Sequence, residues 1–378
     1  MSSARSPLTT LVTVLTSFDD YPIHPTSAPI AFTASGDPNH YDRYFFNGYR
    51  RDASLYFGVA MGLYPNRHVA DASFSVVIGG GRRQISLHSS MRAPVDRAQA
   101  NAVGPIEVRI LEPMRRHRII VDSAEHGIRA DLEFTARSNP VQEPHFFVRN
   151  GLRTIMDYTR LTQFGHWKGW IEAEGVRHEV SGDSFGSRDR SWGIRPIGPV
   201  SDAGAPFASG QFYWLWAPVN FESFATHFDI NEHADGSRWH EVGFVIPDGT
   251  QPAVPSRRVD YRLDWRSGTR WAKAFQLDLQ QPDGTSMRLD FEPLYEFQMR
   301  GIGYFNAEWG HGHWKGDFAV GAEAWDLPVE RPCEPHNLHI QAVCRVTSGN
   351  QQGIGILEQL IIGPHDPSGL TGHFDPAS

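Results

Sequence analysis

Between residues 259 and 292, apolar and charged side chains alternate with a period of two along three consecutive segments. Short turn-forming stretches at 266–269 and 282–285 separate the segments. Because successive side chains of a β-strand point to opposite faces, the pattern predicts three antiparallel strands that share one buried face. Such meanders close readily into up-and-down barrels, which remove the exposed strand edges.

The first half of the chain shows the same alternation. Residues 106–110 and 128–136 alternate cleanly, and residues 73–78 and 84–87 flank three consecutive glycines as the two arms of a hairpin would. Helical patterns are short and few, and the two candidates cover residues 94–102 and 152–164. The sequence therefore predicts an all-β fold made of antiparallel sheets.

The five-residue sequence Gly-His-Trp-Lys-Gly occurs at 165–169 and again at 312–316, and both copies have strand-like surroundings with further glycines. Two scarce residue types thus recur in the same order, once in each half, which favours a duplicated β-domain. The alternative is coincidence in a chain with 11 Trp and 36 Gly. A length of 378 residues also favours two domains. We place the boundary in the Gly- and Pro-rich stretch 198–209, which gives domains of residues 1–200 and 201–378.

Composition excludes several classes of partner. The formal net charge of -8 argues against nonspecific nucleic-acid binding, which needs clustered basic residues. No apolar run reaches the length of a membrane span, and the N-terminal segment lacks a signal-peptide core. The two cysteines, Cys333 and Cys344, are too sparse for a disulfide framework. These observations predict a cytoplasmic protein without membrane insertion.

The first candidate site lies in the polar stretch 182–193. If this stretch is a strand, Arg188, Arg190 and Trp192 point to one face, and Asp189 and Ser191 point to the other. Burial would raise the pKa of the Asp189 carboxyl and make it a proton donor near neutral pH. The alternative is a structural Arg-Asp ion pair that locks a barrel end.

The string from Asp189 to Gly193 resembles the Asp-His/Arg-x-Trp-Gly signature of the AttH-like and carotenoid 1,2-hydratase (hydroxyneurosporene synthase) family. That family is related in fold to fungal Diels–Alderase-type pericyclases. The resemblance implies two tandem lipocalin-like antiparallel β-barrels and a hydrophobic substrate, such as an isoprenoid, a polyketide or a polycyclic compound. It implies neither a nucleotide nor a metal cofactor. This chain departs from the usual signature at Arg190, where His is common, and at Arg188, where an apolar or aromatic residue often precedes the Asp.

The second candidate site is the stretch 304–314, which combines Tyr304, Glu308, Trp309, His311 and His313. As a strand with a glycine bulge, it would bring a carboxylate and two imidazoles together. Glu308 or a histidine could then protonate an alkene while the indoles shield a cationic intermediate. The alternatives are histidines that cap strands and tryptophans that fill the core.

His311 and His313 also have the spacing of a metal-binding pair. His227 and Asp229 complete a ligand set only if folding brings them near. Because zinc needs three or four convergent ligands, we predict no metal.

A third candidate is the aromatic stretch 212–216. Trp214 and Trp216 share one strand face. Facing inward they would line an apolar cavity, facing outward they would pack against the other domain, and either way they could simply fill a core.

No dinucleotide motif, phosphate loop or serine nucleophile elbow accompanies these stretches. We therefore predict a cofactor-independent enzyme that performs acid-assisted hydration, isomerisation or cyclisation of a hydrophobic unsaturated molecule near the domain junction. The alternatives are a noncatalytic carrier of hydrophobic ligands and a scaffold without a ligand. The sequence leaves the oligomeric state open. The predicted catalytic residues are Asp189, Arg190, Glu308, His311 and His313, and the predicted substrate-binding residues are Arg188, Trp192, Trp214, Trp216, His227, Tyr304 and Trp309.

Overall fold

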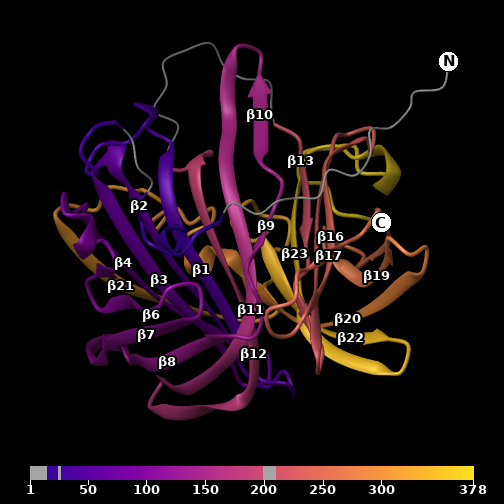
Figure 1. The fold of residues 1–378 in the computed structure, drawn as a ribbon, viewed down its shortest axis with the longest axis horizontal. Coiled ribbons are helices and arrows are strands. Elements are labelled where there is room, and N and C mark those ends of the chain that lie inside the picture. Colours follow the sequence, from indigo (N-terminus) through magenta and orange to yellow (C-terminus); the bar gives the residue numbers. More distant parts are fainter. Residues whose placement is uncertain (1–14, 24–26, 199–209) are drawn as a thin grey trace.

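The computed structural model describes residues 15–23, 27–198 and 210–378, and this part of the chain is all-β (Figure 1). Two antiparallel sheets hold the strands, which confirms the predicted fold class. The helical turns of the described residues are short 3-10 segments: η1 (Ser17–Asp20), η2 (Pro65–Arg67), η3 (Arg97–Gln99), η4 (Ala124–His126), η5 (Met299–Ile302) and η6 (Asp366–Ser368). The helix predicted for residues 152–164 is wrong, because this stretch lies almost entirely in a long strand. No helix in these described ranges is both long and apolar enough to cross a bilayer.

The first sheet has 13 strands. Its main path follows the order β21 (Phe318–Asp326), β4 (Arg83–Arg92), β3 (Val69–Ile78), β2 (Tyr56–Tyr64), β1 (His40–Tyr49), β12 (Val176–Ile194), β11 (Arg153–Ala173), β8 (Ile128–Ala136), β7 (Arg116–Ser123), β6 (Ile106–Glu112) and β5 (Ala102–Val103). The short strands β9 (Val141–Gln142) and β10 (Phe146–Asn150) pair with β11 beside this path. The hairpin predicted around the three glycines is confirmed as β3 and β4.

The second sheet has 10 strands. Its main path follows the order β17 (Val254–Pro255), β16 (Arg238–Pro247), β15 (Phe224–Glu232), β13 (Phe212–Trp216), β23 (Gln351–Ile362), β22 (Ile340–Ser348), β20 (Ser286–Gln298), β19 (Ala272–Gln280) and β18 (Arg258–Trp265), while β14 (Val219–Asn220) pairs with β15 and β23. The predicted meander is confirmed as β18, β19 and β20, and its alternate apolar residues are the ones that face the core.

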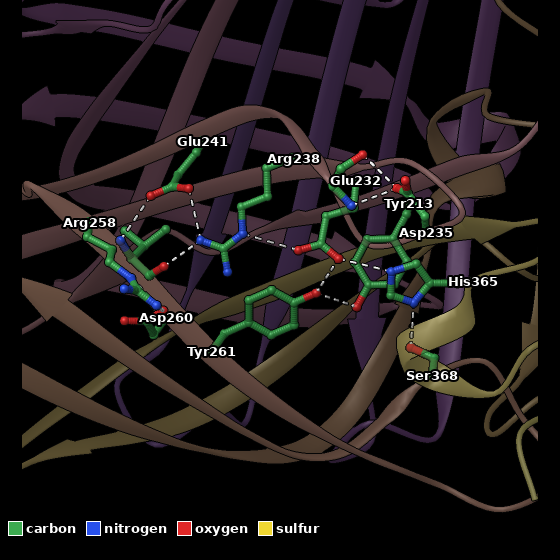
Figure 2. Close-up of polar contacts among 12 residues, drawn as sticks. Tyr213, Glu232, Asp235, Arg238, Glu241, Arg258, Asp260, Tyr261, His365 and Ser368 are labelled. Atoms are coloured by element: carbon green, nitrogen blue, oxygen red, sulfur yellow. Dashed lines mark hydrogen bonds and ion pairs between the residues drawn. The ribbon is translucent and has the colours of Figure 1, made fainter. Parts of the chain in front are cut away.

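Side chains join β18, at one end of the second sheet, to β16, which lies beside the short end strand β17 (Figure 2). Arg238 donates a hydrogen bond to the carbonyl oxygen of Val259 at 2.6 Å, and the Val259 amide donates to the Glu241 carboxylate at 3.1 Å. The Tyr261 hydroxyl donates to Glu232 at 2.9 Å, and His365 contacts the same carboxylate oxygen at 2.9 Å. This network satisfies polar groups at the seam and fixes the C-terminal segment onto the sheet.

The two sheets lie side by side in Figure 1, but they do not divide the sequence into two halves. Strand β21 comes from the second half of the chain, and it pairs with β4 at the edge of the first sheet. A separate apolar cluster joins the sheets, with Phe45 and Tyr56 from the first and Trp216 and Ile356 from the second. The predicted domain boundary, between residues 200 and 201, lies outside the described residues and stays a prediction.

The two copies of the repeated five-residue sequence have different structures. The first copy lies in β11, where Trp167 is fully buried and donates a hydrogen bond to the Asn47 carbonyl oxygen at 2.8 Å. The second copy lies in the irregular segment between η5 and β21, and its Trp314 is 49% exposed. The prediction that both copies occupy strand-like positions is therefore wrong for the second copy.

The long hairpin of β11 and β12 carries the residues of the first candidate site. Glu174 and Gly175 both adopt positive φ angles, of 49° and 75°, which suits a two-residue turn between strands. Strand β12 pairs with β1 on its other side, with Asp189 opposite Phe45 and Ser191 opposite Arg43. The register places these four side chains on one face of the sheet.

Candidate active site between the two sheets

A cavity of about 960 Å³ lies between the two sheets. Strands β1 and β12 form one wall, strands β13 and β23 form the opposite wall, and strands β10 and β11 line part of it. Its apolar lining includes Phe45, Phe212, Trp214, Trp216, Met299 and Leu360, and its charged or polar lining includes Arg43, Tyr158, Arg160, Asp189, Arg195 and Glu358. A mostly apolar chamber with a few converging polar groups is the usual form of a small-molecule site.

Asp189 is the carboxylate on the β12 wall of this cavity. Among the described residues, no side chain or backbone group lies at hydrogen-bond or ion-pair distance from its carboxyl. Burial raises the pKa of this carboxyl to about 6, and Arg160 and Arg43 limit the rise. The group can therefore hold a proton at weakly acidic to near-neutral pH, which is the property that a general acid requires.

The side chains of Arg188 and Arg190 lie on the face of the first sheet opposite to that of Asp189, and each pairs with another aspartate. Arg188 pairs with Asp20 at 2.7 Å, and Arg190 pairs with Asp42. Both guanidinium groups are fully buried. The sequence alternative of a structural ion pair is thus realised by these two arginines, and Asp189 takes no part in it.

Two further arginines meet at the hydroxyl of Tyr304. Arg43 donates to this oxygen at 2.6 Å and Arg195 donates at 3.3 Å. Arg43 is 2% exposed, and both guanidinium groups line the cavity. A phenol oxygen that accepts two charged hydrogen bonds still has its own proton to donate.

A buried ion-pair cluster lies behind the cavity wall. Arg160 pairs with Glu143 at 2.5 Å and also with Asp229. Trp214 donates to Asp229 at 2.7 Å, and His240 contacts the same carboxylate at 3.1 Å. Arg160 lowers the pKa of Glu143 well below its usual range, against the opposing effect of burial. Glu143 is therefore an anion, and one guanidinium group pairs with both carboxyl groups.

The same cluster contains the one potential metal-ligand group found among the described residues. Ligand atoms of Glu143, His227 and Asp229 lie within 4.8 Å of one another. Arg160 already contacts both carboxylates, so a cation bound there would have to displace the guanidinium group. His311 and His313 lie elsewhere in the fold, so the arrangement fits an ion-pair cluster better than a metal centre.

A second carboxylate, Glu358, lies on the β23 wall of the cavity. It accepts a hydrogen bond from Gln341 at 2.6 Å and contacts the His339 imidazole at 2.6 Å. The Tyr304 ring packs edge-on against the same imidazole, with ring centroids 4.4 Å apart. A chain of contacts therefore runs from Arg43 on one wall, through Tyr304 and His339, to Glu358 on the other wall.

The cavity brings together Asp189, Tyr304, Trp214 and Trp216 of the predicted site residues. Arg188 and Arg190 lie in the core of the first sheet, His227 lies beside Glu143 behind the wall, and Trp192 is half-buried on β12 away from the cavity lining.

The stretch 304–314 does not form the predicted strand, and its side chains separate. His311 is buried and contacts the Ile302 carbonyl oxygen at 2.8 Å, which holds it behind Tyr304. Glu308 is exposed and pairs with Lys315 at 2.5 Å. Trp309 stacks on His88 with the rings 8° from parallel, and His313 lines the small crevice beside them. The prediction that one strand face unites these groups is wrong, because turns replace the strand.

Sequence reasoning missed Arg43, Arg195 and Glu358. Only Arg43 left a usable signal, because Tyr41, Arg43 and Phe45 alternate along β1 and share the face that lines the cavity. A charged residue between two aromatic residues on one strand face is unusual in a plain core.

The fold and the site define the class of protein: an all-β protein with a mostly apolar chamber, holding a few polar groups, between two antiparallel sheets. The chain belongs to a family of unknown function (DUF8625), whose family model matches residues 15–371. No curated protein sequence matches the chain.

Among solved structures, kievitone hydratase from Nectria haematococca is similar in fold, with a TM-score of 0.51 and 10% sequence identity over 90% of this chain and 98% of that chain. Two crystal structures of CghA also match, both with a TM-score of 0.45. The match to CghA alone has 12% sequence identity and covers 90% of this chain and 95% of that chain. The match to CghA with Sch210972 has 10% sequence identity and covers 86% of this chain and 89% of that chain.

Proposed function

We propose that the protein is a cofactor-independent enzyme that uses Asp189 as a general acid on a hydrophobic, unsaturated small molecule. The observation that carries this proposal is the state of the Asp189 carboxyl: its pKa is raised to about 6, it has no hydrogen-bond or ion-pair partner among the described residues, and it lines a large cavity. A structural carboxylate would be paired, whereas an acid that serves a substrate must be free to reach it.

The proposed reaction begins with transfer of the Asp189 proton to one carbon of an alkene. In a hydration, water adds to the other carbon, and the proton that this water loses returns to the Asp189 carboxylate. Trp214 and Trp216 line the same cavity, and their rings would stabilise the cationic intermediate. An isomerisation or a cyclisation would begin with the same proton transfer. In an isomerisation, the cation then loses a proton from a neighbouring carbon to the Asp189 carboxylate. In a cyclisation, a nucleophilic group of the same molecule adds to the cation, and the proton that is lost returns to Asp189.

The shared fold of kievitone hydratase supports the proposal, because its name gives it a hydratase activity. The resemblance of residues 189–193 to the AttH-like and carotenoid 1,2-hydratase signature supports it as well. The site also fits a noncatalytic carrier, for which the apolar lining alone would suffice. The unpaired acid favours the enzyme.

The test compares the wild type with Asp189→Asn and a control, Asp183→Asn. Asp183 is exposed on the same strand, where it accepts a hydrogen bond from the Ser181 hydroxyl. Each protein is incubated with a panel of polyenes and α,β-unsaturated ketones, and products are identified by mass spectrometry. We expect Asp189→Asn to lower turnover at least about 100-fold while ligand affinity stays unchanged and the melting temperature does not fall. Ligand that the wild type binds and releases unchanged would identify a carrier, and full turnover by Asp189→Asn would exclude this acid.

A further inference from the structure

The cavity holds more positive charge than its own carboxylates compensate. Arg160 is neutralised by Glu143 and Asp229. By contrast, no carboxylate of the described residues lies within ion-pair distance of Arg43 or Arg195, and their shared polar partner is the neutral hydroxyl of Tyr304. Asp71 and Asp189 act on these arginines only from beyond ion-pair distance. Two largely desolvated guanidinium groups without a carboxylate in contact carry a cost that a bound anion would relieve.

Both guanidinium groups also keep unused donors. Nε of Arg43, and Nε and Nη2 of Arg195, are buried and have no hydrogen-bond partner. The other two nitrogens of Arg43 donate hydrogen bonds to the Tyr304 hydroxyl and, at 3.5 Å, to the Ile302 carbonyl oxygen. Arg195 stacks on the ring of Tyr41 at 4.7 Å, which fixes its plane without using a donor. Other buried polar atoms of the described residues are also unpaired, but these three belong to two arginines that line one cavity, where a ligand would supply the acceptor.

We propose that Arg43, Tyr304 and Arg195 form a clamp for an anionic oxygen group, so that the ligand of this cavity is a hydrophobic carboxylate or an equivalent oxyacid. This inference rests on the proposed function, because it names the substrate class of the same site. Guanidinium groups suit this task, since their donors match the two oxygens of a carboxylate.

The strand register places the clamp close to the acid. Asp189 lies opposite Phe45, and Arg43 lies two residues before Phe45 on the same face of β1. Diagonal neighbours of this kind have their side chains about 7 Å apart at the Cβ atoms. An anion held by Arg43 therefore sets the unsaturated carbons of a ligand a few bonds away, within reach of Asp189, with the rest of the molecule against Trp214 and Trp216.

The experiment measures binding of cis-parinaric acid, a fluorescent polyene carboxylate, and of its uncharged methyl ester at pH 8. We expect the wild type to bind the acid about tenfold or more tightly than the ester, as charge-assisted hydrogen bonds would give. Arg43→Gln, Arg195→Gln and Tyr304→Phe should each weaken the acid severalfold and leave the ester unchanged. Arg288→Gln, which removes an exposed arginine of β20 that pairs with Asp278, is the control with the same change in net charge.

Equal affinity for acid and ester, or no binding of the acid, would overturn the clamp. A melting curve of each variant separates loss of the clamp from loss of folding, and Tyr304→Phe keeps the ring that packs on His311 and His339. The result is independent of turnover. A selective clamp in a protein that converts nothing would contradict the proposed enzyme alone, and turnover without charge selectivity would contradict the clamp alone.

Discussion

Asp189 and Arg190 are consecutive residues of β12, and their side chains lie on opposite faces of the first sheet. Arg190 is fully buried in the sheet interior, where it pairs with Asp42, whereas Asp189 lines the cavity between the sheets. The pleat of the strand thus gives the neighbouring arginine a different counter-ion and leaves the acid unpaired. This separation is what makes Asp189 available to a substrate.

We expect turnover to be constant below about pH 6 and to fall about tenfold for each pH unit above it. The reason is that the reaction needs the protonated acid, and burial raises the pKa of Asp189 to about 6. The measurement is kcat/KM from pH 5 to pH 9. Asp71→Asn is the control, because burial also raises the pKa of Asp71 to about 6 and Asp71 is not among the residues that line this cavity. A pH profile that shifts in Asp71→Asn would show that Asp71, and not Asp189, is the group whose titration controls turnover.

We expect Asp189→Asn to be more stable than the wild type at pH 8 and no more stable at pH 4. With a folded pKa near 6 and an ordinary value of 3.8, the folded state binds more protons than the unfolded state between these values. The stability of the wild type therefore falls as pH rises from about 4 to about 6, and the amide does not titrate. The gain should be about 1–2 kcal/mol, because water in the cavity screens the charge. Urea unfolding at both pH values checks it, and a gain that is equal at pH 4 and pH 8 would contradict the assignment.

Replacing Arg160 or Arg43 by methionine should have very different effects on the free energy of unfolding. Arg160→Met leaves Glu143 and Asp229 as buried charges without their partner, so we expect a loss of about 3–5 kcal/mol in the free energy of unfolding. Arg43→Met removes a charge that has no carboxylate partner, so the free energy should change by no more than about 1 kcal/mol. Urea titrations of both variants make the comparison. A large loss in Arg43→Met would mean that this arginine is structural.

Gly186 and Gly182 lie on the same strand and should tolerate alanine very differently. A Cβ at Gly186 would lie 2.2 Å from the Asn47 oxygen and 2.3 Å from Nε1 of Trp167, the two atoms that form a buried hydrogen bond. We expect Gly186→Ala to cost about 2 kcal/mol or more. Gly182 is exposed, and a Cβ added there would meet no described atom within 4 Å, so Gly182→Ala should be neutral or slightly stabilising. Thermal melting of the pair distinguishes them, and equal melting temperatures would contradict the packing argument.

Local patterns were enough to predict the strands, because alternation is a property of neighbouring residues. Leu277 and Leu289 are buried where the period-two pattern places them, and they face each other across β19 and β20. The same reasoning placed Asp189 and Arg190 on opposite faces. It failed for the stretch 304–314, where composition drew attention to chemistry but the periodicity of a strand was absent.

The composition of the cavity could not be predicted, because it depends on contacts between residues far apart in the chain. Tyr304 reaches Arg43 across 261 positions, and Glu358 faces Asp189 from a different sheet. Nothing in the sequence near Arg195 or Glu358 distinguishes them from structural residues. Only the packing of β13 and β23 against β1 and β12 gives them a common chamber.

The position of β21 at the edge of the first sheet governs the order in which the protein can be completed during synthesis. Strand β4 ends at residue 92, and its partner does not leave the ribosome until residue 326 has been translated. Until then, β4 presents a row of unpaired backbone groups, which is the kind of edge that recruits other chains. Release of the second half of the chain is therefore the step that protects the first sheet from aggregation.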